Sequence, residues 1–204
     1  MSRSFLEEEQ VVRTRLKLLD ISKSFPGVRA LDRVSFDLKV GEVHAICGEN
    51  GAGKSTLMNI LSGNHQPDSG KILLNDEEII ISNQQTALEF GIGIVYQEKS
   101  LVANMTVADN IFAGNQPTTR WHLIDSRKLH SQTQQLLRKL GMNIDSHSQL
   151  SRLPAGAQQM IEIAKALARD PRILILDEPT AALSEKDTQV IFKIIRLMAR
   201  QGKS

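Results

Sequence analysis

A short glycine-rich segment has the residue types and the spacing to bind phosphate. Residues 48–55 read GENGAGKS, with glycines at positions 48, 51 and 53 followed by Lys54 and Ser55. Glycine lets backbone N–H groups converge on an anion, and Lys54 can reach the β- and γ-phosphates of a nucleotide. Ser55 can supply an oxygen to Mg2+, with Thr56 beside it as a further phosphate contact. The spacing predicts a nucleotide-binding phosphate loop.

A pair of acidic residues predicts the other half of such a site. Residues 172–177 read RILILD, an apolar run that ends at Asp177 and is followed by Glu178. A carboxylate at the end of a buried strand is costly unless it has a task, so we expect Asp177 to hold the magnesium shell. Glu178 can polarise an attacking water, which favours hydrolysis over transfer to a substrate. Gln97 follows another strand-like run, and its amide can complete the metal shell or hold the water.

These side chains need strands before them and helices after them. Residues 42–47, EVHAIC, are apolar enough for a buried strand that ends at the phosphate loop, and we expect Cys47 to be a small buried residue in it. The order of elements predicts an α/β nucleotide-binding core with a helical insertion. The other predicted strands are 15–22, 34–39, 71–75, 92–98 and 172–176, and the predicted helices are 54–62, one from about 107, 126–140, 155–168 and one that carries an apolar stripe over 190–198.

Composition excludes several classes of protein. The chain of 204 residues is 41% hydrophobic and 24% charged, which is ordinary for a globular protein. A net charge of +2 makes no electrostatic case for nucleic acid, and a single cysteine rules out an intrachain disulfide. The N-terminus lacks the apolar core of a signal peptide, and no apolar run reaches the ~18 residues of a membrane helix. A membrane role would therefore require a partner.

Together these motifs resemble the nucleotide-binding cassettes of ABC transporters over nearly the whole chain. Gln97 looks like the Q-loop, residues 173–177 like Walker B and Glu178 like the catalytic glutamate. Phe25 has the place of the aromatic that stacks on adenine, although an ordinary core phenylalanine is the open alternative. Residues 179–187, PTAALSEKD, resemble the D-loop, with Ser184 where an aspartate is common. The resemblance assigns ATP binding to Phe25, Gly48, Glu49, Asn50, Gly51, Ala52, Gly53, Lys54, Ser55 and Thr56, and Mg2+ to Ser55, Gln97 and Asp177.

The resemblance also implies an architecture. It is an α/β P-loop NTPase of ABC type, with an N-terminal antiparallel β subdomain and a helical insertion lobe. We expect residues 15–98 to form the β subdomain and Walker A core, and residues 99–170 to form the helical lobe. Residues 171–204 would carry Walker B and the D-loop.

One loop departs from the family's pattern. Residues 153–157, LPAGA, stand where the signature LSGGQ is expected, with Pro154 in place of the serine and Ala157 in place of the glutamine. In the family this loop faces the γ-phosphate held by the opposite cassette. Proline suits a helix start, but the hydroxyl is absent, so we expect a weakened contact through backbone N–H groups. The alternative is that the loop only begins a helix. The signature positions are Leu153, Pro154, Ala155, Gly156 and Ala157.

The resemblance also implies a switch-loop histidine after the D-loop, and none of the five histidines follows Glu178. A fragment of a longer protein and a naturally truncated product are both open interpretations, and a truncated product is expected to be weakly active or non-catalytic.

Within the family, four segments are most similar to bacterial importers for ribose, galactose and xylose, in which two cassettes are usually fused. These segments are LPAGAQQMIEIAKALARDP, VYQE, MTVADNIF and DEPTAALS. The resemblance implies an energy-coupling ATPase, peripheral on the cytoplasmic face of the inner membrane. Its partners would be a second cassette, transmembrane permease subunits and, indirectly, a periplasmic sugar-binding protein, but no nucleic acid. A non-catalytic nucleotide-binding product is one alternative. The other is an ABC ATPase that acts on nucleic acid or the ribosome, although the chain between Gln97 and Leu153 has no room for the added modules of that class.

Overall fold

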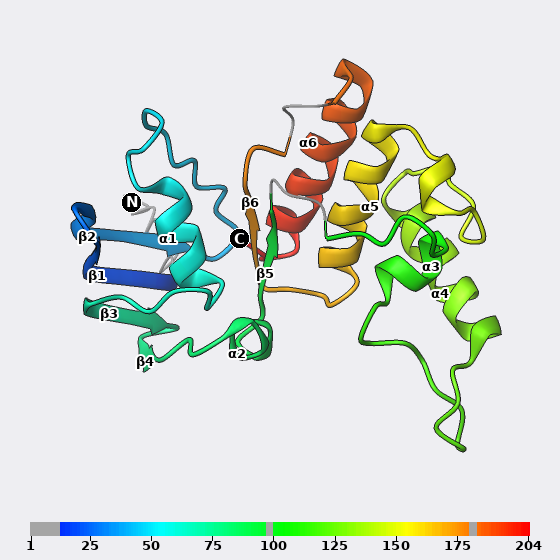
Figure 1. Ribbon diagram of the computed structural model, residues 1–204, viewed down its shortest axis with the longest axis horizontal. Coiled ribbons are helices and arrows are strands. Elements are labelled where there is room, and N and C mark those ends of the chain that lie inside the picture. The colour runs from blue at the N-terminus through cyan, green and yellow to red at the C-terminus, as the bar shows by residue number, and fades with distance from the viewer. Residues whose placement is uncertain (1–12, 97–99, 180–182) are drawn as a thin grey trace, which may run out of the picture.

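The computed structural model describes residues 13–96, 100–179 and 183–204 (Figure 1). Gln97 lies outside these residues, as does Thr180 of the D-loop. The elements in chain order are β1 (Thr14–Phe25), β2 (Val28–Lys39), α1 (Lys54–Leu61), β3 (Ser69–Leu74), β4 (Glu77–Ile79), α2 (Gln84–Glu89), β5 (Ile92–Val95), α3 (Val107–Ile111), α4 (Ser126–Lys139), a 3-10 turn at Leu150–Arg152, α5 (Ala155–Leu167), β6 (Ile173–Leu176) and α6 (Glu185–Arg200).

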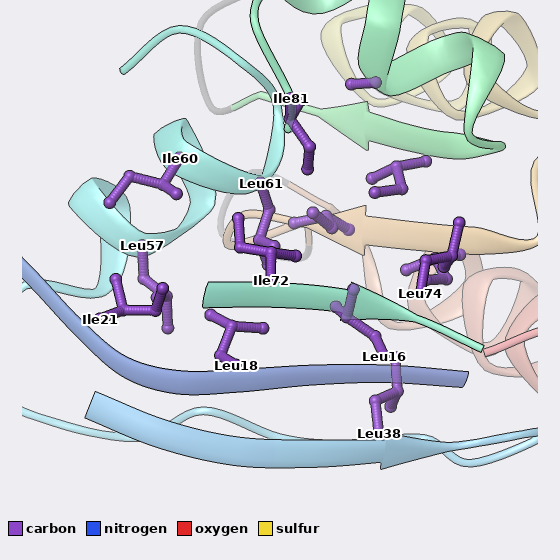
Figure 2. Close-up of a cluster of buried hydrophobic side chains, with 14 of the residues drawn as sticks. Leu16, Leu18, Ile21, Leu38, Leu57, Ile60, Leu61, Ile72, Leu74 and Ile81 are labelled. Carbon is purple, nitrogen blue, oxygen red and sulfur yellow. The ribbon is translucent and has the colours of Figure 1, made fainter. Parts of the chain in front are cut away.

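The first core lies between an antiparallel sheet and helix α1. The sheet has the strand order β2-β1-β3-β4, and alternate residues of β1 such as Leu16 and Leu18 are fully buried because successive strand side chains point to opposite faces. Figure 2 shows Leu57 of α1 pointing toward Ile21 and Leu61 pointing toward Ile72, and Ile60 belongs to the same apolar cluster. This core fixes the axis of α1, and therefore the loop at its N-terminus.

A parallel pair of strands positions the acidic residues. Strand β5 pairs with β6 in the register Ile92↔Ile173 to Val95↔Leu176, and the N–H of Asp177 donates to the carbonyl of Val95 over 3.1 Å. Both strands therefore end at the same edge. The residues that follow them, Asp177 included, leave the sheet at this edge.

The second core joins the helical half to the last helix. Figure 1 shows α5 and α6 side by side beyond the β5–β6 pair. Helix α6 buries Ile191, Ile194 and Met198 of its predicted stripe. They share one apolar cluster with Ile161 and Ile163 of α5 and with residues of α3 and α4. Packing against α3 and β5 within this cluster holds α5, and with it the signature loop at the start of α5.

The strand predicted at 42–47 is wrong. Residues 42–49 are in neither helix nor strand, and Cys47, expected to be buried, is exposed. Val43 and Ile46 line a cavity of about 340 Å3 together with residues of β6. The apolar pattern correctly indicated proximity to the core. A strand also requires backbone pairing, and this segment has no place in either sheet, where β6 pairs with β5.

The other predicted elements are present, and most of their ends differ by one or two residues, as at Thr14 of β1 and Lys139 of α4. The exceptions are strands: β1 continues to Phe25, β2 begins at Val28 and not at residue 34, and β5 ends at Val95, while the predicted end at 97–98 lies outside the described residues. The sequence analysis missed β4 and α2, which are short. The division at residues 98 and 170 stays a prediction. Within the described ranges, no helix has the length and apolar content needed to cross a membrane.

Candidate nucleotide site

The phosphate loop has the backbone conformation that its glycines predict. Gly51 and Gly53 have φ values of 84° and 89°, in the left-handed region that glycine adopts without a steric penalty. A Cβ atom on Gly53 would also lie 2.3 Å from the carbonyl oxygen of Ala30 in β2. Position 53 therefore excludes other residues for two reasons, conformation and close approach.

The loop presents positive groups to its concave side. Helix α1 begins at Lys54 with no side-chain cap and no acidic residue in its first turn, so its first N–H groups remain available to an anion. The Lys54 ammonium donates to the carbonyl oxygens of Gly48 and Glu49 over 2.7 and 2.9 Å. Those bonds hold the ammonium against the loop, where it can exchange carbonyl oxygens for phosphate oxygens.

The loop opens into a cavity of about 500 Å3 that gathers residues from four parts of the chain. Phe25, at the end of β1, is half-buried there and meets His65 edge to face with ring centroids 5.4 Å apart. The site therefore combines an aromatic side chain with the phosphate loop in one cavity. The cavity is lined by Phe25, Val28, Arg29, Ala30, Asn50, Gly51, Gly53, Lys54, Ser55, Thr56, Asp177 and Glu178.

The acidic pair enters the same cavity from the end of β6. Asp177 is half-buried and Glu178 is exposed. Glu178 has φ 45°, a left-handed conformation that costs a non-glycine residue of order 1–3 kcal/mol. Such strain is common at functional sites, and here it turns the chain sharply just after the last residue of the β5–β6 pairing.

The residues fit a nucleotide with its metal ion. Among the residues that the structure describes, no cluster of three or more His, Cys, Asp or Glu side chains could hold a metal by itself. Mg2+ is usually held by one or two protein oxygens together with phosphate oxygens. Asp177 and Ser55, which line one cavity, are that type of incomplete donor set.

The structure thus brings together most of the predicted site. Gly48, Glu49 and Ala52 belong to the loop backbone but do not line the cavity. The metal-binding and catalytic role predicted for Gln97 falls outside the described residues and stays a prediction, as do the roles of the other site residues.

The predicted signature loop lies elsewhere. None of residues 153–157 lines the cavity. Pro154 is the N-cap of α5 rather than its first helical residue, and the first intrahelical bond runs from Gln158 N–H to the Pro154 carbonyl. The backbone N–H groups of residues 155–157 therefore have no intrahelical acceptor. The helix begins without the serine, as expected.

Sequence reasoning missed the contribution of β2. Val28, Arg29 and Ala30 line the cavity, and Val28 is 60% exposed although it is apolar. An exposed apolar residue directly after the turn at 26–27 was the available signal, but the position of Ala30 beside Gly53 depends on long-range packing.

We expect Gly53→Ala to cost more stability than the same change at Gly141, the control. Gly141 has φ 72° with nothing within 4 Å of an added Cβ, so only the conformational penalty of about 1–2 kcal/mol applies there. At Gly53 the approach to Ala30 adds to that penalty. Urea unfolding of both variants measures the difference. Equal losses at the two positions would contradict the close approach.

A glycine-rich loop at the N-terminus of a helix, with an acidic pair at the end of a parallel strand in the same cavity, defines a P-loop nucleotide-binding domain. The ABC transporter family model matches residues 31–181, and the chain belongs to this family. The match includes the phosphate loop, the helical half and Walker B.

Curated relatives carry names of sugar importers. The chain is 46% identical over 188 residues to the putative ribose/galactose/methyl galactoside import ATP-binding protein 2 of Burkholderia lata, covering 92% of this chain and 36% of that protein. It is 47% identical over 189 residues to the xylose import ATP-binding protein XylG of Geobacillus kaustophilus, covering 92% of this chain and 37% of that protein. The chain thus spans little more than a third of the length of these relatives.

Solved ATP-binding cassettes have the same fold. A nucleotide-free cassette from an ABC transporter matches with TM-score 0.81 and 25% identity, over 93% of this chain and 78% of that one. The ADP conformation of the cassette MJ1267 matches with TM-score 0.80 and 25% identity, over 93% and 78% of the two chains. The predicted fold class, an α/β P-loop fold of ABC type with an antiparallel β subdomain, is confirmed.

Proposed function

We propose that this chain is the ATP-binding, energy-coupling part of an importer for a sugar, and that it hydrolyses ATP where two cassettes meet. The observation that carries the proposal is the cavity in which the phosphate loop, Phe25, Asp177 and Glu178 converge. The relatives named as ribose, galactose and xylose import proteins support the sugar class.

Each side chain has a separate task in this proposal. Phe25 stacks on the base, and the free N–H groups at the start of α1 bind the phosphates together with the Lys54 ammonium. Mg2+, when bound, neutralises phosphate charge, and Ser55, Asp177 and Gln97 would hold it. Glu178 accepts a proton from the attacking water and so increases its nucleophilicity.

The remaining interactions involve other subunits. In this proposal the N-terminus of α5, which has no side-chain cap, binds the nucleotide held by a second cassette through its first N–H groups. Residues 153–157 do not line the cavity beside Lys54, which agrees with a role at the other nucleotide. Transmembrane permease subunits receive the movement of the two cassettes, and a periplasmic sugar-binding protein delivers the sugar to them. The chain would act as a peripheral subunit at the cytoplasmic face of the inner membrane.

Thermal unfolding with nucleotide tests this assignment. With ATP and Mg2+ at about 100 times Kd, binding to the native state stabilises it by about 2.7 kcal/mol, or roughly 5–10 °C for a chain of this size. The shift should increase with ATP concentration and decrease when EDTA removes the metal. An unchanged melting temperature at millimolar ATP, for a sample that unfolds cooperatively, would reject the proposed function.

A further inference from the structure

The loop between α3 and α4 is a closed hairpin that extends away from the rest of the chain (Figure 1). Thr118 and Ile124 form an antiparallel bridge. The N–H of Thr119 donates to the Leu123 carbonyl and that of Asp125 to the Pro117 carbonyl, each over 2.8 Å. Asp125 then caps α4 by accepting from the Lys128 N–H over 3.0 Å. Backbone bonds on both sides of the tip therefore give residues 117–125 a defined shape, called here the α3–α4 hairpin.

The tip of this hairpin exposes large apolar side chains. Trp121 is 77% exposed, Leu123 68% and Ile124 54%, and they are within four residues of one another. Single exposed apolar residues are normal on a surface, but an adjacent group of this size indicates contact with another apolar medium. The hairpin extends away from the rest of the chain (Figure 1), so its tip is placed to insert into a deformable medium.

Cations lie on both sides of the apolar residues along the chain, Arg120 within the hairpin and Arg127 and Lys128 in the first turn of α4. Arg120, Arg127 and Lys128 are exposed, and their side chains form no ion pair with any residue in the described part of the chain. The neighbouring acidic residue, Asp125, is engaged at the helix N-terminus. The region around the tip thus carries a net positive charge that complements an anionic surface.

We propose that the α3–α4 hairpin binds the surface of a bilayer that contains anionic phospholipid. Tryptophan is favoured at the level of the lipid headgroups, Leu123 and Ile124 would enter the acyl boundary, and the three cations would meet lipid phosphates. One weak anchor gives only marginal binding, whereas an apolar anchor together with basic residues gives stable attachment. This surface is separate from the nucleotide cavity and does not depend on the proposed ATPase function.

Trp121 is the only tryptophan in the chain, so its fluorescence reports directly on the tip. With vesicles of phosphatidylcholine and phosphatidylglycerol, its emission should shift to shorter wavelength as the indole leaves water. Phosphatidylcholine vesicles alone should give a much smaller shift. Added salt should weaken the binding because it screens the attraction of the cations to the phosphates.

Variants measured by vesicle sedimentation separate the two contributions. We expect Leu123→Ser with Ile124→Ser, and separately Arg127→Gln with Lys128→Gln, each to weaken binding about tenfold. Ile80→Ser is the apolar control, because Ile80 is 74% exposed on another part of the chain. Arg138→Gln with Lys139→Gln, in the last turn of the same helix, is the charge control.

The outcomes also distinguish this proposal from the proposed function. Lys54→Ala should bind vesicles as the unchanged chain does, even where ATP no longer stabilises it. Absence of binding to anionic vesicles would overturn the proposal, as would equal losses in the tip variants and their controls. Binding only to vesicles that carry a permease would also overturn it and would assign the hairpin to a protein partner.

Discussion

Lys54→Ala should abolish the stabilisation of this chain by ATP and Mg2+. The Lys54 ammonium lies within 2.9 Å of two loop carbonyl oxygens, at the concave side where phosphates would bind. A charge-assisted hydrogen bond contributes about 1.5–3 kcal/mol, and more than one phosphate oxygen would lose its cation, so affinity should fall at least about 100-fold. Thermal unfolding over a series of ATP concentrations measures the change.

The variant itself should fold. Lys54 is partly exposed, and water can bond the carbonyl oxygens of Gly48 and Glu49 once the ammonium is removed. Lys139→Ala is the matched control, because Lys139 is an exposed lysine in helix α4, outside the cavity. An undiminished ATP response in Lys54→Ala, with Lys139→Ala unchanged, would show that the loop does not bind phosphate.

Glu178→Gln should nearly stop ATP hydrolysis while leaving ATP binding intact. The amide keeps the size of the side chain and the backbone turn at φ 45°, but it cannot accept a proton from water. Loss of a general base lowers turnover by about 10²–10⁴-fold. Phosphate release at saturating ATP, in the presence of the cassette that completes the interface, measures turnover. Thermal stabilisation by ATP checks that binding is retained.

Pro154→Ser provides a contrast at the other end of the helical half. If Lys54 and Glu178 form the productive site with the signature of the opposite cassette, residues 153–157 face the other ATP. Restoring the serine hydroxyl should then change turnover by less than about twofold, since the ATP that faces residues 153–157 contributes little to the overall rate of hydrolysis. A gain of about tenfold or more, together with substantial activity in Glu178→Gln, would mean that the productive site had been assigned to the wrong cassette.

The departures at the signature loop illustrate what local sequence could predict. Proline at position 154 was expected to permit a helix, and α5 does begin directly after it. The absence of a serine hydroxyl at position 154 can also be read directly from the sequence. The position of the α5 N-terminus relative to a phosphate cannot be read from local sequence, because it depends on the packing of α5 against α3 and β5 and on a second cassette.

The segment at 42–47 illustrates a feature that the local sequence could not predict, namely its secondary structure. Its apolar residues gave the correct environment, since Ile46 packs partly against the first core. Its secondary structure could not follow from the pattern, because a strand exists only where another backbone supplies hydrogen bonds. Helices are predicted better from sequence, since their hydrogen bonds join residues four apart.

The sequence by itself determined the phosphate loop, the acidic pair after β6 and the helices that carry apolar stripes, because each depends on residues a few positions apart. The tertiary structure alone decided that Gly53 must lie against Ala30, that Val28 and Arg29 line the nucleotide cavity, and that Asp177 leaves the sheet beside the end of β5. These placements join segments up to about 150 residues apart, and the free energy that selects them comes from burying two apolar cores. No local pattern contains that long-range packing.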